Sequence, residues 1–310
     1  MSFKSKLIKS IFRTAALSSF GISSLITSST AAKAEEFNMS ACPDSGSSNA
    51  TIAYIRDTLN GQCLHTPEQY KLTIYEMGLC TSNPISTNVF NKSNCTATMV
   101  SASGTVVDLA PGSSSAKIAA LPSASTRPAS NTYTHAYILL GNGFNMKGSY
   151  TLSDGTTTFY SKEETDEWGT YGAADSSLTA AQEHTDLVDN MYFGEEEDGW
   201  DGIMSESTMP GGGKVSALLL KECTNTGNAD GDTCVGANGV AASQGEVKRL
   251  LGVFETNAGS PVTITDSTNG VEVELVVKQG GYLVWLNNPG NGWTIGGFGS
   301  APFKPTFTTF

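Results

Sequence analysis

The sequence predicts an all-β protein, folded as an antiparallel β-sandwich or a β-barrel-like sheet. Short runs of alternating apolar and polar residues recur along the chain, and Asp-Gly or Asn-Gly turns separate several of them. Helical patterns do not alternate with these runs, which disfavours a doubly wound α/β fold. A short amino-terminal helix and an acidic, partly helical excursion over residues 163–201 are expected to depart from the sheets.

The first 34 residues predict a secretory signal peptide. Basic residues precede a stretch of small and apolar residues over 15–26, and Ala32-Lys33-Ala34 fits the small-x-small pattern that signal peptidase cleaves. A retained membrane-anchored helix is the alternative, but the apolar stretch has roughly half the length that a membrane span needs. We therefore expect an exported protein that is secreted, periplasmic or at the cell surface.

Composition divides the rest of the chain into three regions. Residues 35–112 form a small, disulfide-containing amino-terminal region, and residues 113–131 form a loop or linker rich in Ser, Ala and Pro. Residues 132–310 form the main β-rich domain.

The charge of the chain argues against two classes of partner. The sequence has 18 basic and 30 acidic residues, a net charge of −12 at pH 7. The predicted signal peptide holds 5 of the basic residues and no acidic one, so its removal leaves 13 basic residues and a net charge of −17. Such a chain repels polyanions, and we expect it to bind neither nucleic acid nor an anionic membrane surface.

All six cysteines follow the predicted signal peptide, and an even number in an exported chain indicates disulfides. Pairing of neighbours along the chain gives Cys42 with Cys63, Cys80 with Cys95, and Cys223 with Cys234. A zinc site is the rival interpretation, but the sequence has no CxxC pair and its three histidines are scattered.

In the amino-terminal region we expect a helix and two β elements. Ile52, Ile55 and Leu59 share one helical face, and the following Asn-Gly pair ends that helix. Residues 70–75 alternate as a half-buried strand does, and residues 96–100 and 105–109 are expected to pair as a hairpin.

In the main domain a type I′ hairpin is expected at Asp154-Gly155, because alternating runs lie on both sides of it. The other expected strands cover residues 135–140, 214–221, 247–256, 261–265, 271–277 and 281–286.

The acidic excursion over residues 163–201 combines carboxylates with aromatic residues, and its residues 177–190 predict a helix. Carboxylates beside tryptophans are typical of sites that bind or cleave carbohydrates. The candidate ligand surface consists of Trp168, Glu195, Glu196, Trp200 and Asp201. The alternative is a solvated loop with no ligand.

The loop between Cys223 and Cys234 is a candidate calcium site. Asn228, Asp230 and Asp232 place oxygen ligands around a tight turn, although the closing glutamate of an EF-hand loop is absent. The alternative is a plain polar loop closed by a disulfide. Calcium is the one cofactor that the sequence suggests.

The sequence contains no GxSxG, no HExxH, no GxxxxGK(S/T) and no GxGxxG after a predicted strand. His184 lies near Asp186 and Asp189, as a base and an orienting carboxylate would, but acidic neighbours of a surface histidine are common. The sequence therefore favours a role without catalysis.

The carboxyl-terminal tail contains Phe303, Phe307 and Phe310, with two prolines that forbid a regular helix. We expect an extended segment whose rings pack on the chain's own fold or on a neighbouring subunit. The terminal phenylalanine resembles the end of outer-membrane β proteins, although the prolines interrupt the pattern.

Together these features favour an exported, β-rich structural, adhesive or self-assembling protein. A secreted carbohydrate-binding or carbohydrate-cleaving protein is the first alternative, and an outer-membrane-associated β protein is the second. The expected partners are further copies of the chain, in a homo-oligomer or filament, or surface glycans.

Overall fold

The computed structural model describes residues 39–110, 115–118, 124–125, 127–166, 169–188, 202–209, 212–226, 231–288 and 292–310. All pairs of named strands within these ranges are antiparallel, which confirms the predicted all-β, sandwich-like or barrel-like fold class. The predicted signal peptide lies outside the described residues, as do residues 113–114, 119–123 and 126 of the predicted linker. Residues 115–118 and 124–125 of that linker are short strands.

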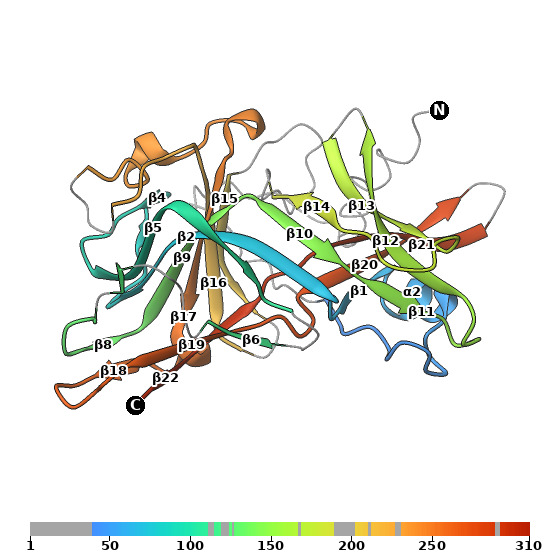
Figure 1. Cartoon of the computed structure of the whole chain (residues 1–310), viewed down its shortest axis with the longest axis horizontal. Coiled ribbons are helices and arrows are strands. Elements are labelled where there is room, and N and C mark those ends of the chain that lie inside the picture. The colour runs from blue at the N-terminus through green and yellow to red at the C-terminus, as the bar shows by residue number, and fades with distance from the viewer. Residues whose placement is uncertain are drawn as a thin grey trace, which may run out of the picture.

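The larger sheet has nine strands and extends from the left of Figure 1 toward its centre. Its main path is β14 (His184–Leu187), β10 (Gly143–Lys147), β2 (Gln69–Cys80), β9 (His135–Gly141), β17 (Arg249–Glu255), β16 (Lys214–Leu220) and β15 (Ile203–Thr208). Off this path, β5 (Cys95–Asp108) pairs with β2 and with the short β7 (Ala124–Ser125).

The smaller sheet has six strands and occupies the right of Figure 1 beside the helix α2 (Ile52–Thr58). Its order is β1 (Gln62–His65), β20 (Gly281–Asn288), β21 (Gly292–Ser300), β13 (Gly169–Asp175), β12 (Thr158–Asp166) and β11 (Ser149–Thr151).

Short elements complete the fold. Three small sheets consist of β22 (Lys304–Thr309), β19 (Val271–Val276) and β6 (Ser115–Ile118), of β18 (Val262–Ile264) and β8 (Asn131–Tyr133), and of β3 (Ile85–Ser86) and β4 (Val89–Phe90). Three 3-10 turns are η1 (Ala237–Gly239), η2 (Gln244–Glu246) and η3 (Thr256–Gly259).

The helix α2 forms as the sequence predicts. The Thr51 hydroxyl accepts a hydrogen bond from the Tyr54 backbone N–H at 3.0 Å and caps its first turn. Asn60 and Gly61, with φ of 54° and 79°, follow its end. Ile55 is fully buried in the core beside the smaller sheet, so tertiary packing holds this short helix.

The strand β2 is the centre of the larger sheet. Tyr70, Leu72 and Ile74 alternate with partly exposed residues and lie in the main hydrophobic core, as predicted. One edge of β2 pairs with β5, and the other pairs with β10 and then β9. Strands from before and after the predicted linker therefore share one sheet.

The three disulfides join the predicted pairs. Cys42 bonds to Cys63, Cys80 to Cys95, and Cys223 to Cys234, and no free cysteine remains. The first lies beside the smaller sheet, and the other two lie in a second core that also contains Tyr137.

The predicted hairpin of residues 96–100 and 105–109 is wrong. Both runs belong to β5 and pair with the same strand, β2, with Val100 opposite Glu76 and Thr105 opposite Ile74. Residues 101–104 bulge out instead of reversing the chain. Gly104 has φ of 77°, and a Cβ there would lie 2.4 Å from the side chain of the opposite strand, so glycine is needed at this bulge.

Two further predictions are corrected. Residues 177–188 are not helical: they include β14, where His184 is buried and pairs with β10, so that sheet pairing overrides the local helical pattern. The hairpin at residues 149–166 forms, but its turn is not type I′, because Gly155 has positive φ and Asp154 does not. The Asp154 carboxylate instead accepts the N–H groups of Thr156 and Thr157 at 2.9 and 2.8 Å.

The carboxyl-terminal tail is extended, as predicted, and forms β22 against β19. Phe303 and Phe307 are buried within the chain's own cores, whereas Phe310 is 69 % exposed. Each buried ring contributes about 2 kcal/mol through the apolar surface it removes from water.

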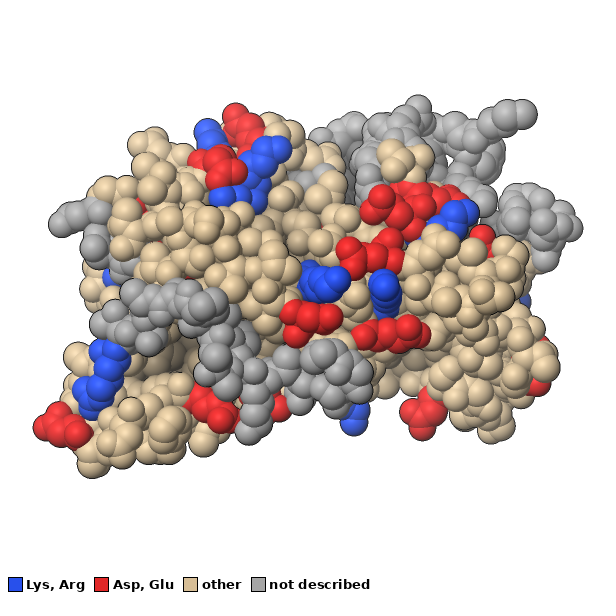
Figure 2. Space-filling view, in the orientation of Figure 1, with Lys and Arg blue, Asp and Glu red and all other residues tan. Residues whose placement is uncertain are grey.

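Charged side chains gather in separate groups on the face that Figure 2 shows, with acidic and basic residues side by side. Exposed pairs such as Lys71 with Glu183 (2.9 Å) and Lys162 with Glu164 (3.2 Å) add little stability each. Within the described part of the chain, no helix has the length and apolar character needed to cross a membrane.

Candidate functional site

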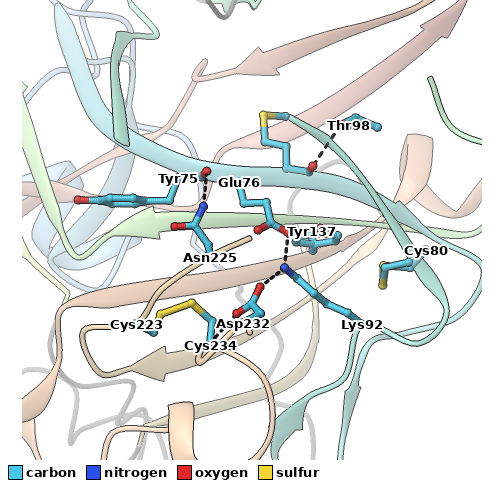
Figure 3. A network of polar contacts seen from close by, with 12 residues as sticks. Tyr75, Glu76, Cys80, Lys92, Thr98, Tyr137, Cys223, Asn225, Asp232 and Cys234 are labelled. Carbon is cyan, nitrogen blue, oxygen red and sulfur yellow. Dashed lines mark hydrogen bonds and ion pairs between the residues drawn. A yellow bond between two sulfur atoms is a disulfide. The ribbon is translucent and has the colours of Figure 1, made fainter. Parts of the chain in front are cut away.

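The most unusual chemistry in the described residues is a buried ionic cluster at the second core. It consists of Glu76, Lys92, Tyr137 and Asp232, which converge between two disulfides (Figure 3). Four separate parts of the chain supply these side chains: β2, the loop before β5, β9 and the loop closed by Cys223 and Cys234.

A bulge in β2 turns Glu76 toward this cluster. Ile74 lies opposite Leu140 of β9, but Glu76 lies opposite Leu139, so β2 carries one extra residue, Tyr75. One extra residue reverses the face to which the following side chain points. Glu76 therefore leaves the face of Ile74, in the main core, for the face of Leu139, in the second core, where it is fully buried.

Lys92 enters the cluster from the loop between β4 and β5. The Asn91 carboxamide accepts the Ser93 backbone N–H at 2.9 Å, and the Lys92 carbonyl accepts the Cys95 N–H at 2.9 Å, so the loop is tightly folded. The Lys92 Nζ lies 2.5 Å from Asp232 Oδ2 and also contacts Glu76 Oε1. The side chain of Lys92 is 3 % exposed.

Asp232 points inward from the disulfide-closed loop. Its Oδ1 accepts the backbone N–H of Cys234 at 2.8 Å, while its Oδ2 contacts Lys92. The same loop is attached to the β2 bulge, because the Asn225 side chain donates to the Tyr75 carbonyl at 2.9 Å. Backbone and disulfide thus fix the position of this carboxylate.

Tyr137 closes the cluster from β9. Its hydroxyl donates to Glu76 Oε1 at 2.5 Å, and its ring centroid lies 5.8 Å from Lys92 Nζ. Burial, together with the neighbouring charge of Glu76, raises the pKa of Tyr137 well above its ordinary value. Gly78 makes room for this ring, since a Cβ there would lie 2.4 Å from it.

The cluster contains two carboxyl groups and one amino group, all out of contact with bulk water. The side chains of Glu76 and Asp232 are 0 % exposed. With all three groups ionised the cluster has a net charge of −1 in a region of low dielectric, which is unfavourable unless hydrogen bonds compensate. One oxygen, Glu76 Oε2, makes no hydrogen bond to the described residues.

A cavity of about 160 Å³ lies in the main core. Apolar side chains including Tyr70, Leu140, Phe144, Phe254 and Phe303 line it. The hydroxyl of Tyr70 donates to the Ala301 carbonyl at 3.2 Å, and burial raises the pKa of Tyr70 above its ordinary range. A cavity with this lining can accept a small apolar group but holds no described acid–base pair.

Two histidines are buried where the two sheets meet. His65 of β1 packs edge-on against Phe298, with ring centroids 5.4 Å apart, and burial lowers its pKa to about 4. Burial also lowers the pKa of His184 of β14. Both rings are therefore neutral near pH 7, and His184 does not lie at the surface as a histidine with acidic neighbours commonly does.

Of the predicted calcium ligands, the structure describes only Asp232. Asn228 and Asp230 lie outside the described residues, and the oxygens of Asp232 are bonded to Lys92 and Cys234. Within the described ranges, no group of three or more His, Cys, Asp or Glu side chains is arranged to hold a metal ion. The calcium site stays a prediction for the rest of that loop.

The predicted ligand surface lies outside the described residues. This holds for all five of its members: Trp168, Glu195, Glu196, Trp200 and Asp201. Of the tail residues, Phe303 and Phe307 are core residues, and Phe310 is the exposed one.

Sequence reasoning missed Glu76, Lys92 and Tyr137. One signal was available: Glu76 interrupts the run YKLTIYEMGLC, in which apolar residues otherwise dominate the second half. A carboxylate in such a run must find a partner when the strand is buried. The sequence does not identify its partners, because Tyr137 lies 61 residues from Glu76 and Lys92 comes from a separate loop.

Comparison of the chain with protein-family models, with curated proteins and with solved structures finds no match.

Proposed function

We propose that this chain is an exported structural protein of the cell surface or the extracellular space. The observation that carries the proposal is the cross-linked second core, where two disulfides and a buried ionic cluster fasten distant segments together. Disulfides persist in oxidising compartments, outside the cytosol. Cross-links of this kind suit a protein that has to stay folded outside the cytosol.

The proposed export is tested by producing the full chain, with a carboxyl-terminal tag, in a bacterium that has a periplasm. We expect export, a mature chain that starts near Glu35, and three intact disulfides. Retention in the cytosol with free thiols would contradict the proposal. A chain whose residues 1–34 are removed serves as the control for export.

Structural role is tested by imaging and sizing the purified mature protein over a range of concentrations. Filaments, sheets or large homo-oligomers are expected of a structural protein that assembles. A monomer at every concentration that binds or cleaves an oligosaccharide would instead favour the carbohydrate alternative. The glycan test uses the mature chain and an array of common surface glycans.

A further inference from the structure

We propose that Lys92 and Asp232 form an amide bond within the chain, between the Lys92 side-chain nitrogen and the Asp232 side-chain carbonyl carbon. Formation of this bond depends on the buried cluster alone, wherever the protein acts. It would make the second core cross-linked by a bond that reducing agents cannot break.

Position is the first argument. The Lys92 Nζ lies 2.5 Å from Asp232 Oδ2, and both side chains are held from several directions. Reacting groups fixed in contact behave as if at very high concentration, with effective molarities of about 10⁵ M or more in favourable cases. The cluster thus removes most of the entropic barrier to joining these two side chains.

Burial is the second argument. Both partners are nearly inaccessible to solvent, with side-chain exposures of 3 % for Lys92 and 0 % for Asp232. A buried ion pair is a weak stabiliser, because desolvation offsets the attraction of its charges. Condensation replaces this pair with a neutral amide and releases one water molecule from a site that excludes water.

Glu76 is placed to carry protons. It contacts the same Lys92 nitrogen, and Tyr137 holds it there through a hydrogen bond of 2.5 Å. Glu76 accepts a proton from the Lys92 ammonium and passes it to Asp232 Oδ2, so that a neutral amine attacks the carbon of a neutral carboxyl group and forms the nitrogen–carbon bond. After a second proton has passed from the nitrogen to Oδ2, the carbon–oxygen bond breaks and Oδ2 leaves as water.

Two protons leave the nitrogen, Glu76 carries them, and both end on the departing oxygen as water. The Cys234 backbone N–H, at 2.8 Å from Oδ1, stabilises the negative charge that develops on that oxygen during attack. Glu76 returns to its starting state, and no oxidant or further reactant is needed.

Asp232, rather than Glu76, is the carboxyl group that condenses. Its Oδ1 has a fixed backbone donor and its Oδ2 contacts the amine, which is the arrangement that attack at the carbon between them requires. Glu76 directs one oxygen at both Lys92 and Tyr137, while its Oε2 makes no hydrogen bond to the described residues. That geometry suits repeated proton transfer.

The test is the intact mass of the purified mature chain after full reduction and denaturation. We expect the mass of one water less than the sequence requires, and a tryptic peptide pair joined through Lys92 and Asp232 in tandem mass spectra. The exposed pair Lys71 and Glu183, 2.9 Å apart, is the internal control and stays unjoined. A full mass, or a bond between other residues, would overturn the proposal.

Two variants test the roles. Lys92→Met removes the amine at similar length and gives the full mass. Glu76→Gln keeps the shape of the side chain but not its proton transfer, and a folded variant is expected to show at least a tenfold smaller cross-linked fraction. A folded Glu76→Gln chain that is fully cross-linked refutes the role of Glu76. Because the wild-type mass alone decides whether the bond exists, failure of a variant to fold leaves the test valid.

Discussion

Acidification is expected to destabilise the protein through His65. This histidine is 7 % exposed and packs against Phe298 where the two sheets meet. Burial is the main cause that lowers its pKa from 6.5 to about 4; the nearby His184 lowers it further, and the Thr66 backbone partly opposes the shift. Glycines at positions 148 and 281 leave the ring no spare room, since a Cβ at either would lie within 2.8 Å of it.

The sign of the effect follows from proton binding. In the unfolded chain His65 binds a proton below pH 6.5, whereas in the folded chain it does so only below about pH 4. The free energy of unfolding therefore falls as pH decreases through this interval. Between these two pKa values the free energy of unfolding changes by about 1.4 kcal/mol per pH unit, and the total loss by pH 4, where the folded-state ring is half protonated, is about 3 kcal/mol.

The assay is urea unfolding of the mature chain at several pH values between 7 and 4, in the wild type and in His65→Phe. Phenylalanine does not titrate, and any packing cost of its larger ring is the same at every pH, so the variant is expected to lose about 3 kcal/mol less than the wild type over this range. Separately, the His65 ring signals in NMR spectra are expected to titrate with a midpoint near 4.

The matched control is His135→Gln, because His135 is only partly buried and its ring bonds to Thr134 at 2.8 Å. Its pKa is also lowered by burial, but nearby carboxylates oppose that shift, so the control should keep most of the wild-type pH dependence. Parallel loss of stability in the wild type and His65→Phe would refute the reasoning.

Three other predictions concern stability and are measured by denaturant unfolding at pH 7. Phe307→Ala is expected to cost about 3 kcal/mol and Phe310→Ala less than about 0.5, because only the first ring is buried; equal effects would contradict own-fold packing of the tail. Gly104→Ala should destabilise more than Gly155→Ala, since both have positive φ but only the first would clash; the reverse order would refute the assigned bulge. Tyr137→Phe removes the hydroxyl donor to the buried Glu76 carboxylate and should cost about 1–3 kcal/mol; an unchanged free energy of unfolding would contradict this hydrogen bond.

Local patterns were sufficient for part of the fold. Alternation of Tyr70, Leu72 and Ile74 predicted both a strand and its buried face, because the period of side chains along a strand is fixed. The α2 helix and its termination before Asn60 and Gly61 were predicted for a similar reason, since the sequence around a helix end determines which backbone conformations are available. Pairing of neighbouring cysteines was correct as well.

Long-range pairing decided what local patterns could not. Residues 101–104 have the composition of a turn, and the same composition serves a bulge when both flanking runs pair with one partner. The prediction of a helix over residues 177–190 was wrong because β14, which contains His184, pairs with β10. The sequence of neither segment identifies the strand with which it pairs.

The buried cluster was missed for the same reason. Asp232 lies in a loop rich in Asn, Asp and Gly, and such loops usually face water. Its inward direction depends on Lys92, which comes from another loop 140 residues away. The bulge that turns Glu76 toward both is likewise set by the pairing of β2 with β9.

The pairing of β1 with β20 has a consequence for the order of folding. Gln62–His65 leave the ribosome well before their partners at residues 281–284 have been synthesised. The smaller sheet therefore cannot close until those partners exist, and contacts between such distant segments form slowly, with the edge of β1 unpaired in the meantime.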